Sequence, residues 1–166
     1  MLGLGFFKGQ RILIDYLSKE LTVFDAASGF DPDREPGWIE VPFRHSEEGL
    51  VLEAMIDGRP HDMVLDTGAT ISFAVADRIA DTAAAVPCQS VYASLEQEGC
   101  RLIPVDTQFG DTAASVHAFL IEDSPGHFGA TGLLGGDFLQ HHAVFVDFAG
   151  KRMYVRPDQK PQSSSR

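Results

Sequence analysis

The stretch MVLDTGAT, residues 63–70, is the part of the sequence that decides the fold. Three apolar residues, typical of a buried strand, run without a break into Asp66, Thr67 and Gly68. A glycine here lets the backbone turn tightly and leaves amide groups free to hydrogen-bond the carboxylate. The stretch therefore predicts a carboxylate at a fixed point on a rigid turn. The residues expected to support this turn are Thr67, Gly68, Ala69 and Thr70.

Short apolar runs separated by turn residues surround this stretch. GLVLEAMI (49–56) and RPHDMVLD (59–66) flank Asp57-Gly58, and an Asp-Gly pair between two apolar runs is a strong hairpin signal. A helical pattern is confined to a stretch near 74–84 and to one or two turns in GDFLQHH (136–142). Many short strands with few helices predict a mostly-β fold. Further strands are expected at 100–107, 114–122, 143–148 and 151–156.

A second motif, GLLGGDFL (132–139), follows the first in the order and at a spacing that resemble the retropepsin-like aspartic proteases, in particular the bacterial type of that family. The resemblance covers residues 38–156. It implies a closed β-barrel with one or two short helices, and Asp66 as a catalytic carboxylate. It further implies that Leu133, Leu134 and Gly135 form a strand beside the catalytic turn. By this resemblance the chain is an aspartic endopeptidase acting on a peptide or protein substrate.

Only one Asp-Thr-Gly is present, because Asp106-Thr107 and Asp111-Thr112 lack the following glycine. The reaction implied by the resemblance needs two carboxylates that share one proton. The second must come from another Asp-Thr-Gly domain, either in a symmetric homodimer or in an upstream tandem copy. The alternative is a catalytically inactive retropepsin-fold module that serves binding or dimerisation.

An internal repeat bears on the upstream copy. Leu2 to Val23 aligns without gaps on Leu134 to Val155, and Tyr16 falls on Phe148. We therefore expect residues 1–24 to form a β-hairpin that resembles the C-terminal end of a preceding protease-like repeat. The identities are Leu2/Leu134, Gly3/Gly135, Phe6/Phe138, Asp15/Asp147, Lys19/Lys151 and Val23/Val155.

The resemblance also implies a mobile hairpin, or flap, that closes over substrate. The best candidate runs from Val91 to Ile103, although a plain surface hairpin is an equal alternative. Cys88 and Cys100 flank it and would clamp its base if they are paired. Its expected tip consists of Glu96, Gln97, Glu98 and Gly99.

Composition and charge limit the partners. The 166 residues contain 24 Asp+Glu and 13 Lys+Arg, a formal net charge of −11, which disfavours nucleic acid because that partner needs a basic patch. No apolar run approaches the roughly 20 residues of a membrane span. Without a Cys-x-x-Cys, no metal site is predicted, and neither is any other cofactor; we expect His141-His142 to be an exposed pair.

The ends of the domain are marked by composition. Residues 25–37, rich in Gly, Pro and Asp, predict a linker, and residues 157–166 predict a disordered tail. The first residues do not form a signal peptide. Localisation is therefore unknown, and an exported, periplasmic parent would need a longer N-terminus.

Overall fold

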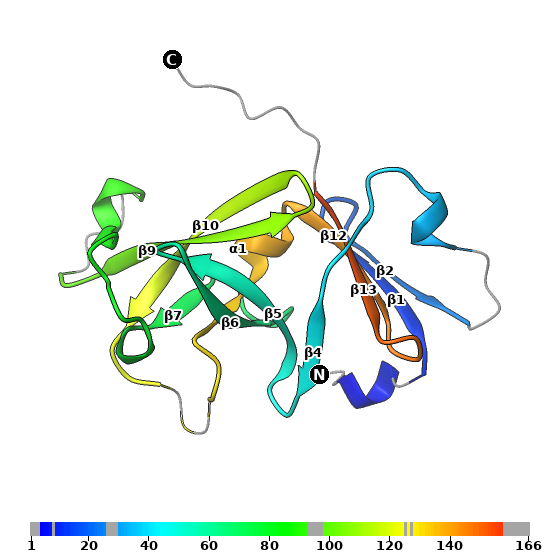
Figure 1. Ribbon diagram of the computed structural model, residues 1–166, viewed down its shortest axis with the longest axis horizontal. Coiled ribbons are helices and arrows are strands. Elements are labelled where there is room, and N and C mark those ends of the chain that lie inside the picture. The colour runs from blue at the N-terminus through cyan, green and yellow to red at the C-terminus, as the bar shows by residue number, and fades with distance from the viewer. Residues whose placement is uncertain are drawn as a thin grey trace, which may run out of the picture.

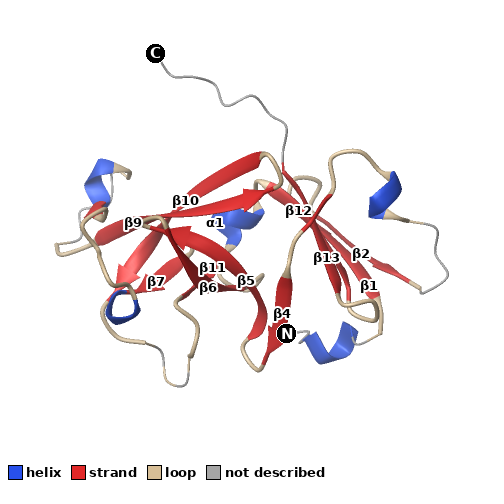
Figure 2. Ribbon diagram, viewed as in Figure 1, coloured by secondary structure: helices blue, strands red, loops and turns tan. Residues whose placement is uncertain are grey.

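The computed structural model describes residues 4–7, 9–25, 30–92, 98–124, 126 and 128–157. The predicted tail, apart from its first residue, and the flap residues Glu96 and Gln97 lie outside this part. Within it the strands form two sheets, which lie side by side in Figures 1 and 2. The predicted mostly-β fold class is confirmed.

The larger sheet closes into a barrel, shown on the left of Figure 1. Its order is β4-β5-β6-β11-β7-β10-β9-β8, and a pairing of Met55 with Asp106 joins β5 to β9 and closes the ring. Closure leaves the inward-facing apolar side chains in one continuous core. The strand bounds are β4 Phe43–Ser46, β5 Gly49–Ile56, β6 Arg59–Leu65, β7 Phe73–Val75, β8 Val86–Pro87, β9 Arg101–Phe109, β10 Thr112–Ile121 and β11 Gly132–Leu134.

The hairpin predicted around the Asp-Gly pair is present. Asp57 and Gly58 both have positive φ, 50° and 70°, and β5 pairs antiparallel with β6 on either side of them. Of the short helices, α1 (Gly136–Leu139) lies where one was expected. The helix expected near 74–84 is wrong, because Phe73–Val75 pairs with both β10 and β11 as strand β7, and only the 3-10 turn η3 (Ala76–Arg78) follows.

The smaller sheet has the order β2-β1-β12-β13-β3 and lies on the right of Figure 1. Its strands are β1 (Arg11–Asp15), β2 (Glu20–Phe24), β3 (Ile39–Glu40), β12 (His142–Asp147) and β13 (Arg152–Pro157). Two hairpins, β1–β2 and β12–β13, meet at its centre through the antiparallel pair β1 and β12. The 3-10 turn η1 (Leu4–Phe7) precedes the first hairpin, as α1 precedes the second.

These two hairpins have the same internal geometry. In the repeat alignment Ile12 is equivalent to Val144, and Val23 is equivalent to Val155. Ile12 pairs with Val23 across the first hairpin, and Val144 pairs with Val155 across the second, so the two hairpins have the same register. Lys19 and Lys151, which are also equivalent, both have positive φ. In the β1–β12 pair Leu13 faces its own repeat equivalent Phe145, so a local two-fold axis passes between them.

The described part of the segment predicted as a linker contacts the smaller sheet. Its described part includes η2 (Pro32–Arg34), and Asp33 and Glu40 both accept hydrogen bonds from the Arg152 guanidinium, at distances from 2.9 to 3.2 Å. We call these three residues the Arg152 cluster. Hydrogen bonds from Arg152 lower the pKa values of Asp33 and Glu40 below their ordinary values of 3.8 and 4.5.

The structure also shows the state of the two cysteines and of His142. Cys88, at the start of the 3-10 turn η4 (Cys88–Ser90), forms a disulfide with Cys100. His142 is buried, with its ring stacked on Phe138 and its Nδ1 2.8 Å from the Phe138 carbonyl oxygen, so the expectation of an exposed histidine pair is wrong for His142.

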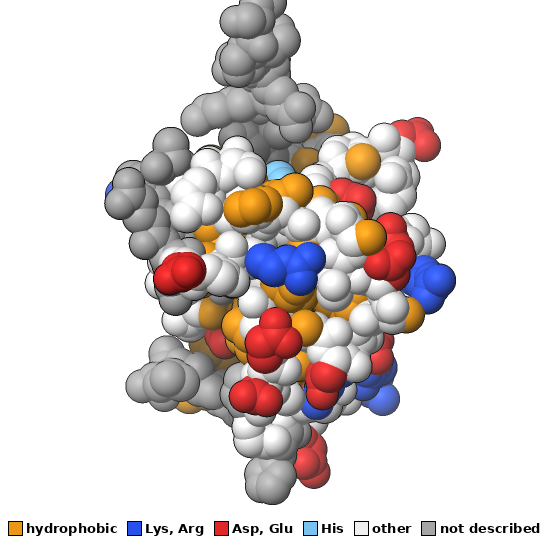
Figure 3. All heavy atoms as spheres, turned by 90° about the vertical axis from the view of Figure 1, so that its left-hand side faces the viewer, with side chains coloured by type: hydrophobic (Ala, Val, Ile, Leu, Met, Phe, Trp, Pro, Cys, Tyr) orange, Lys and Arg blue, Asp and Glu red, His pale blue; other side chains and the backbone are white. Residues whose placement is uncertain are grey.

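Figure 3 shows the barrel face opposite the smaller sheet, where acidic side chains outnumber basic ones.

Candidate active site

Asp66 follows β6 directly, at the point where the strand leaves the barrel core. Met63, Val64 and Leu65 are buried, whereas Asp66 is partly exposed and Thr67 and Gly68 are exposed. The Gly68 N–H donates to Asp66 Oδ1 at 2.8 Å. The predicted arrangement, a carboxylate held on a tight turn by a backbone amide, is therefore what the chain forms.

Of the residues predicted as a strand beside this turn, Leu133 and Leu134 lie in β11, and Gly135 follows the strand directly and precedes α1. β11 pairs in parallel with β6, with Leu134 opposite Leu65, and the Asp66 N–H donates to the Leu134 carbonyl oxygen at 3.0 Å. Beyond the strand, the Gly136 N–H donates to the Ala69 carbonyl oxygen at 2.8 Å. The Asp137 N–H donates likewise to Thr70, at 3.2 Å. The backbone of the second motif thus holds the turn from one end to the other.

Glycine is required where β11 passes its neighbours. A Cβ atom added to Gly132 would lie 2.2 Å from the Phe73 carbonyl oxygen, and one added to Gly135 would lie 2.7 Å from that of Ile71. Both distances are shorter than the closest non-bonded approach of a carbon atom to a carbonyl oxygen. The two motifs can approach this closely only because these positions lack a side chain.

A buried serine ties the two motifs together, and the sequence analysis missed it. The Ser72 hydroxyl donates to Asp137 Oδ1 at 2.6 Å and accepts from the Gly135 N–H at 3.0 Å. The Ser72 N–H donates to the other carboxylate oxygen of Asp137 at 2.9 Å. Asp137 therefore serves as an acceptor for the loop that follows the Asp66 turn. The only signal in the sequence was an acidic residue directly after the Gly-Gly pair.

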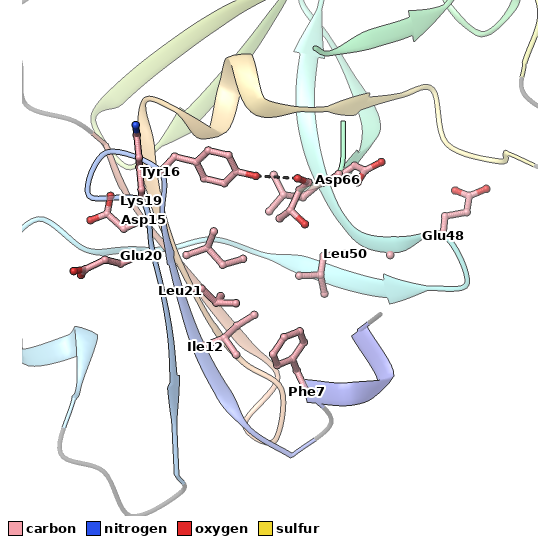
Figure 4. A pocket seen from close by; sticks show the side chains of 15 residues that line it. Phe7, Ile12, Asp15, Tyr16, Lys19, Glu20, Leu21, Glu48, Leu50 and Asp66 are labelled. Atoms are coloured by element: carbon pink, nitrogen blue, oxygen red, sulfur yellow. Dashed lines mark hydrogen bonds between the residues drawn. The ribbon is translucent and has the colours of Figure 1, made fainter. Parts of the chain in front are cut away.

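Asp66 borders two hollows. The first, about 780 Å³, lies between the Asp66 turn and the β1–β2 hairpin, and Tyr16 reaches across it (Figure 4). The second, about 820 Å³, lies on the other side, between the β4–β5 turn and the loop at 128–130. Glu48 of the β4–β5 turn lines both. The Asp66 carboxylate is therefore accessible from two sides of the turn.

Tyr16 makes the direct link between the smaller sheet and the turn. Its hydroxyl donates to the Thr67 carbonyl oxygen at 2.9 Å. Burial of the ring and the nearby Asp66 carboxylate raise the pKa of the Tyr16 phenol above its ordinary value of 10.0. The sequence did not mark Tyr16 as a residue of the site. Its alignment with Phe148, which differs by one hydroxyl, was the available signal.

The candidate flap stands apart from these hollows in the part of it that the structure describes. Glu98 and Gly99 are exposed and line neither hollow. The base of the segment is clamped by the disulfide and by pairing of β8 with the start of β9. The flap assignment stays a prediction. Among the described residues, Glu47 and Glu48 of the β4–β5 turn line the second hollow together with Asp66.

Among the described residues no three His, Cys, Asp or Glu side chains are grouped so that they could hold a metal ion. No helix in this part of the chain is both long enough and apolar enough to span a bilayer.

The architecture is shared with proteins of known structure. An aspartic proteinase from Irpex lacteus matches with a TM-score of 0.52 and 11% sequence identity, over 98% of this chain. The chain has the fold of an aspartic proteinase. It spans 61% of that protein's length. Basic 7S globulin from soybean also matches, with a TM-score of 0.46, 11% identity and coverage of 92% of this chain and 52% of its own.

No protein-family model and no curated protein sequence matches the chain. The aspartic proteinase fold therefore rests on the structural likeness, and that likeness does not distinguish the bacterial retropepsin type, which stays a prediction. At 11% identity the likeness shows the fold alone. Any activity has to be argued from the residues of this chain.

Proposed function

We propose that the chain supplies one half of an aspartic endopeptidase site, with Asp66 as its catalytic carboxylate. The observation that carries the proposal is Asp66 itself, held by the Gly68 N–H on an exposed turn of an aspartic proteinase fold and facing two hollows. The substrate class is an extended peptide or protein segment, and no cofactor is needed.

The proposed reaction uses a pair of carboxylates that share one proton. The ionised member takes a proton from a bound water as the water oxygen attacks the scissile carbonyl carbon. The protonated member donates a hydrogen bond to the carbonyl oxygen, on which negative charge develops. The tetrahedral intermediate then expels the amine, which receives a proton from the pair. One Asp-Thr-Gly per chain therefore requires a second domain that carries another.

The exposed side of the β1–β2 hairpin supports such a partner. Phe6, Leu21 and Val23 are 62%, 53% and 45% exposed. Their equivalents in the second half of the repeat, Phe138, Met153 and Val155, are at most 1% exposed because they pack against the barrel. We call the first three residues the open face.

The matched geometry of the two hairpins indicates what covers the open face. Since α1 and β12–β13 pack against the core of this chain's barrel, the equivalent elements η1 and β1–β2 fit against the core of a second barrel of the same fold. We propose that residues 1–24 are the C-terminal end of that preceding domain, and that residues 38–156 are the protease domain described here. The two-fold axis between Leu13 and Phe145 would then relate the two barrels.

Cleavage of an unstructured protein tests the proposal. Asp66→Asn keeps the shape of the side chain but removes the charge that the pair must share, so it should abolish cleavage. Asp106→Asn is the matched control, because Asp106 is an exposed carboxylate that is also followed by threonine. A statine-type inhibitor should block the wild type, since its hydroxyl occupies the position of the attacking water. Equal cleavage by the wild type and Asp66→Asn would refute the assignment.

Dependence on concentration separates the sources of the second domain. If a homodimer supplies it, specific activity should fall as the protein is diluted through its dimer dissociation constant. If an upstream domain supplies it, the chain beginning at Met1 should be inactive at every concentration and a tandem chain active as a monomer. A tandem chain that binds peptide without cleaving it would instead identify an inactive binding module.

A further inference from the structure

The contact between Tyr16 and the Asp66 turn reaches the carboxylate through a single peptide group. The Tyr16 hydroxyl donates to the carbonyl oxygen of Thr67, and the N–H of the same Thr67–Gly68 peptide donates to Asp66 Oδ1. The two bonds measure 2.9 and 2.8 Å and follow one another along one amide plane. Figure 4 shows the phenol crossing the hollow toward the turn.

Two hydrogen bonds on one amide strengthen each other. A donor on the carbonyl oxygen draws electron density from the nitrogen, which makes the N–H a better donor to the carboxylate, an effect of about 10–30% per bond in condensed-phase estimates. It also restricts rotation of the peptide, and with it the direction from which Gly68 contacts Asp66. Tyr16 thereby acts on the carboxylate without touching it.

The electrostatic setting keeps the phenol in its donating form. Burial and the charge of Asp66 raise the pKa of Tyr16, so the hydroxyl holds its proton throughout the neutral and acidic range. The other titratable groups that line this hollow are Asp15, Lys19 and Glu20 from the hairpin and Glu48 from the β4–β5 turn. The hydrogen bond to the Thr67 carbonyl oxygen is donated by Tyr16 and not by any of these four groups.

The hydrogen bond made by Tyr16 has no counterpart in the second half of the repeat. Phe148 occupies the place of Tyr16 in the second hairpin and has no hydroxyl to donate. In a two-barrel assembly Tyr16 would hold the turn of this barrel, whereas Phe148 would meet the turn of the other without a hydrogen bond. The two carboxylates of the pair would then be held unequally even though their domains are alike.

We propose that Tyr16 is a positioning residue that orients the Asp66 carboxylate through the Thr67–Gly68 peptide and makes Asp66 the more firmly held member of the pair. The second half of this statement rests on the proposed function. The first half concerns this chain alone and can be tested without any activity.

The test of the first half follows the Gly68 amide by NMR in Tyr16→Phe. Loss of the hydroxyl should move the Gly68 N–H resonance upfield and speed its exchange with solvent, because its hydrogen bond to Asp66 weakens. Tyr92→Phe is the control, since Tyr92 is 40% exposed and stacks on Phe119. Phenylalanine at the equivalent position 148 indicates that the fold tolerates the change. A Gly68 resonance that does not differ between the two variants would overturn the proposal.

A second readout is the titration of Tyr16 itself. Replacing Asp66 by Asn should lower the pKa of Tyr16, since the Asp66 charge helps to raise it. An unchanged Tyr16 titration would show that the phenol does not lie beside the Asp66 turn, and would overturn the proposal on that ground.

Kinetics test the second half in whichever assembly is active. Tyr16→Phe should lower kcat about fivefold to tenfold with KM unchanged, which corresponds to the loss of one hydrogen bond of about 1 kcal/mol. Tyr92→Phe should change neither constant. A shifted Gly68 resonance with an inactive wild-type assembly would leave the peptide coupling established and refute the proposed function instead. A shifted resonance with unchanged kcat would refute the catalytic part of the inference.

Discussion

Replacement of Ser72 by alanine should destabilise the protein, because the Ser72 hydroxyl joins the two sequence motifs of the site. Ser72 is fully buried and its hydroxyl both donates to Asp137 and accepts from the Gly135 N–H. Alanine leaves the backbone in place, including the Ser72 N–H bond to the other oxygen of Asp137. The change therefore isolates one hydroxyl between the two motifs.

The size of the effect follows from the two bonds. A hydrogen bond to a charged group contributes about 1.5–3 kcal/mol, and a buried donor left without an acceptor costs about 1–3 kcal/mol. Taking values near the lower end of both ranges, we expect a loss of about 3 kcal/mol in the free energy of unfolding. For a chain of this size that is a fall in Tm of about 6–12 °C.

Thermal unfolding followed by circular dichroism, with the disulfide oxidised, measures this loss. Ser115→Ala is the control, because Ser115 is an exposed serine on β10. Combining Ser72→Ala with Asp137→Ala should destabilise by less than the sum of the single changes, since both remove the same bond. If Ser72→Ala unfolds within a degree or two of Ser115→Ala, the proposed coupling of the two motifs is wrong.

Three further changes test other parts of the fold. Gly132→Ala places a Cβ against a backbone carbonyl and should cost about 3 kcal/mol or more in urea unfolding. Both carboxyl groups of the Arg152 cluster have lowered pKa values in the folded protein, so their ionised forms stabilise the fold above pH 4.5. This contribution is lost as the pH falls through the pKa values of the folded state. The difference in free energy of unfolding between the wild type and Arg152→Met should therefore shrink between pH 5 and pH 3. Reduction of the Cys88–Cys100 disulfide, which joins residues 12 apart, should cost about 3 kcal/mol, measured by urea unfolding with and without reductant.

The parts of the fold that could be predicted from sequence are those governed by local chemistry. The Asp57-Gly58 turn needed two residues with positive φ, and β5 and β6 have the predicted bounds to within one residue. The repeat was visible because its two copies share residues at the turn. The Asp66 turn was likewise predictable from its own residues, an apolar run followed by Asp-Thr-Gly.

The parts that could not be predicted depend on contacts distant in sequence. Residues 74–84 contain many good helix formers, yet β7 forms there because β10 and β11 offer it hydrogen bonds on both edges. The bond between Ser72 and Asp137 crosses 65 residues, and that between Tyr16 and Thr67 crosses 51. No local pattern marks such pairs, so the contacts of Ser72 and Tyr16 could not be predicted, whereas the turn at Asp66 could.

The place of β11 in the barrel has a consequence for the newly made chain. β6 ends at Leu65, but its neighbour β11 begins only at Gly132, so the Asp66 turn gains its backbone partners after most of the domain has left the ribosome. Parallel pairing over such a separation is slow, because a long loop must close first. We expect the Asp66 turn to be among the last features to form. Under the proposed function, a nascent chain would then carry no assembled site while its own segments are still unfolded.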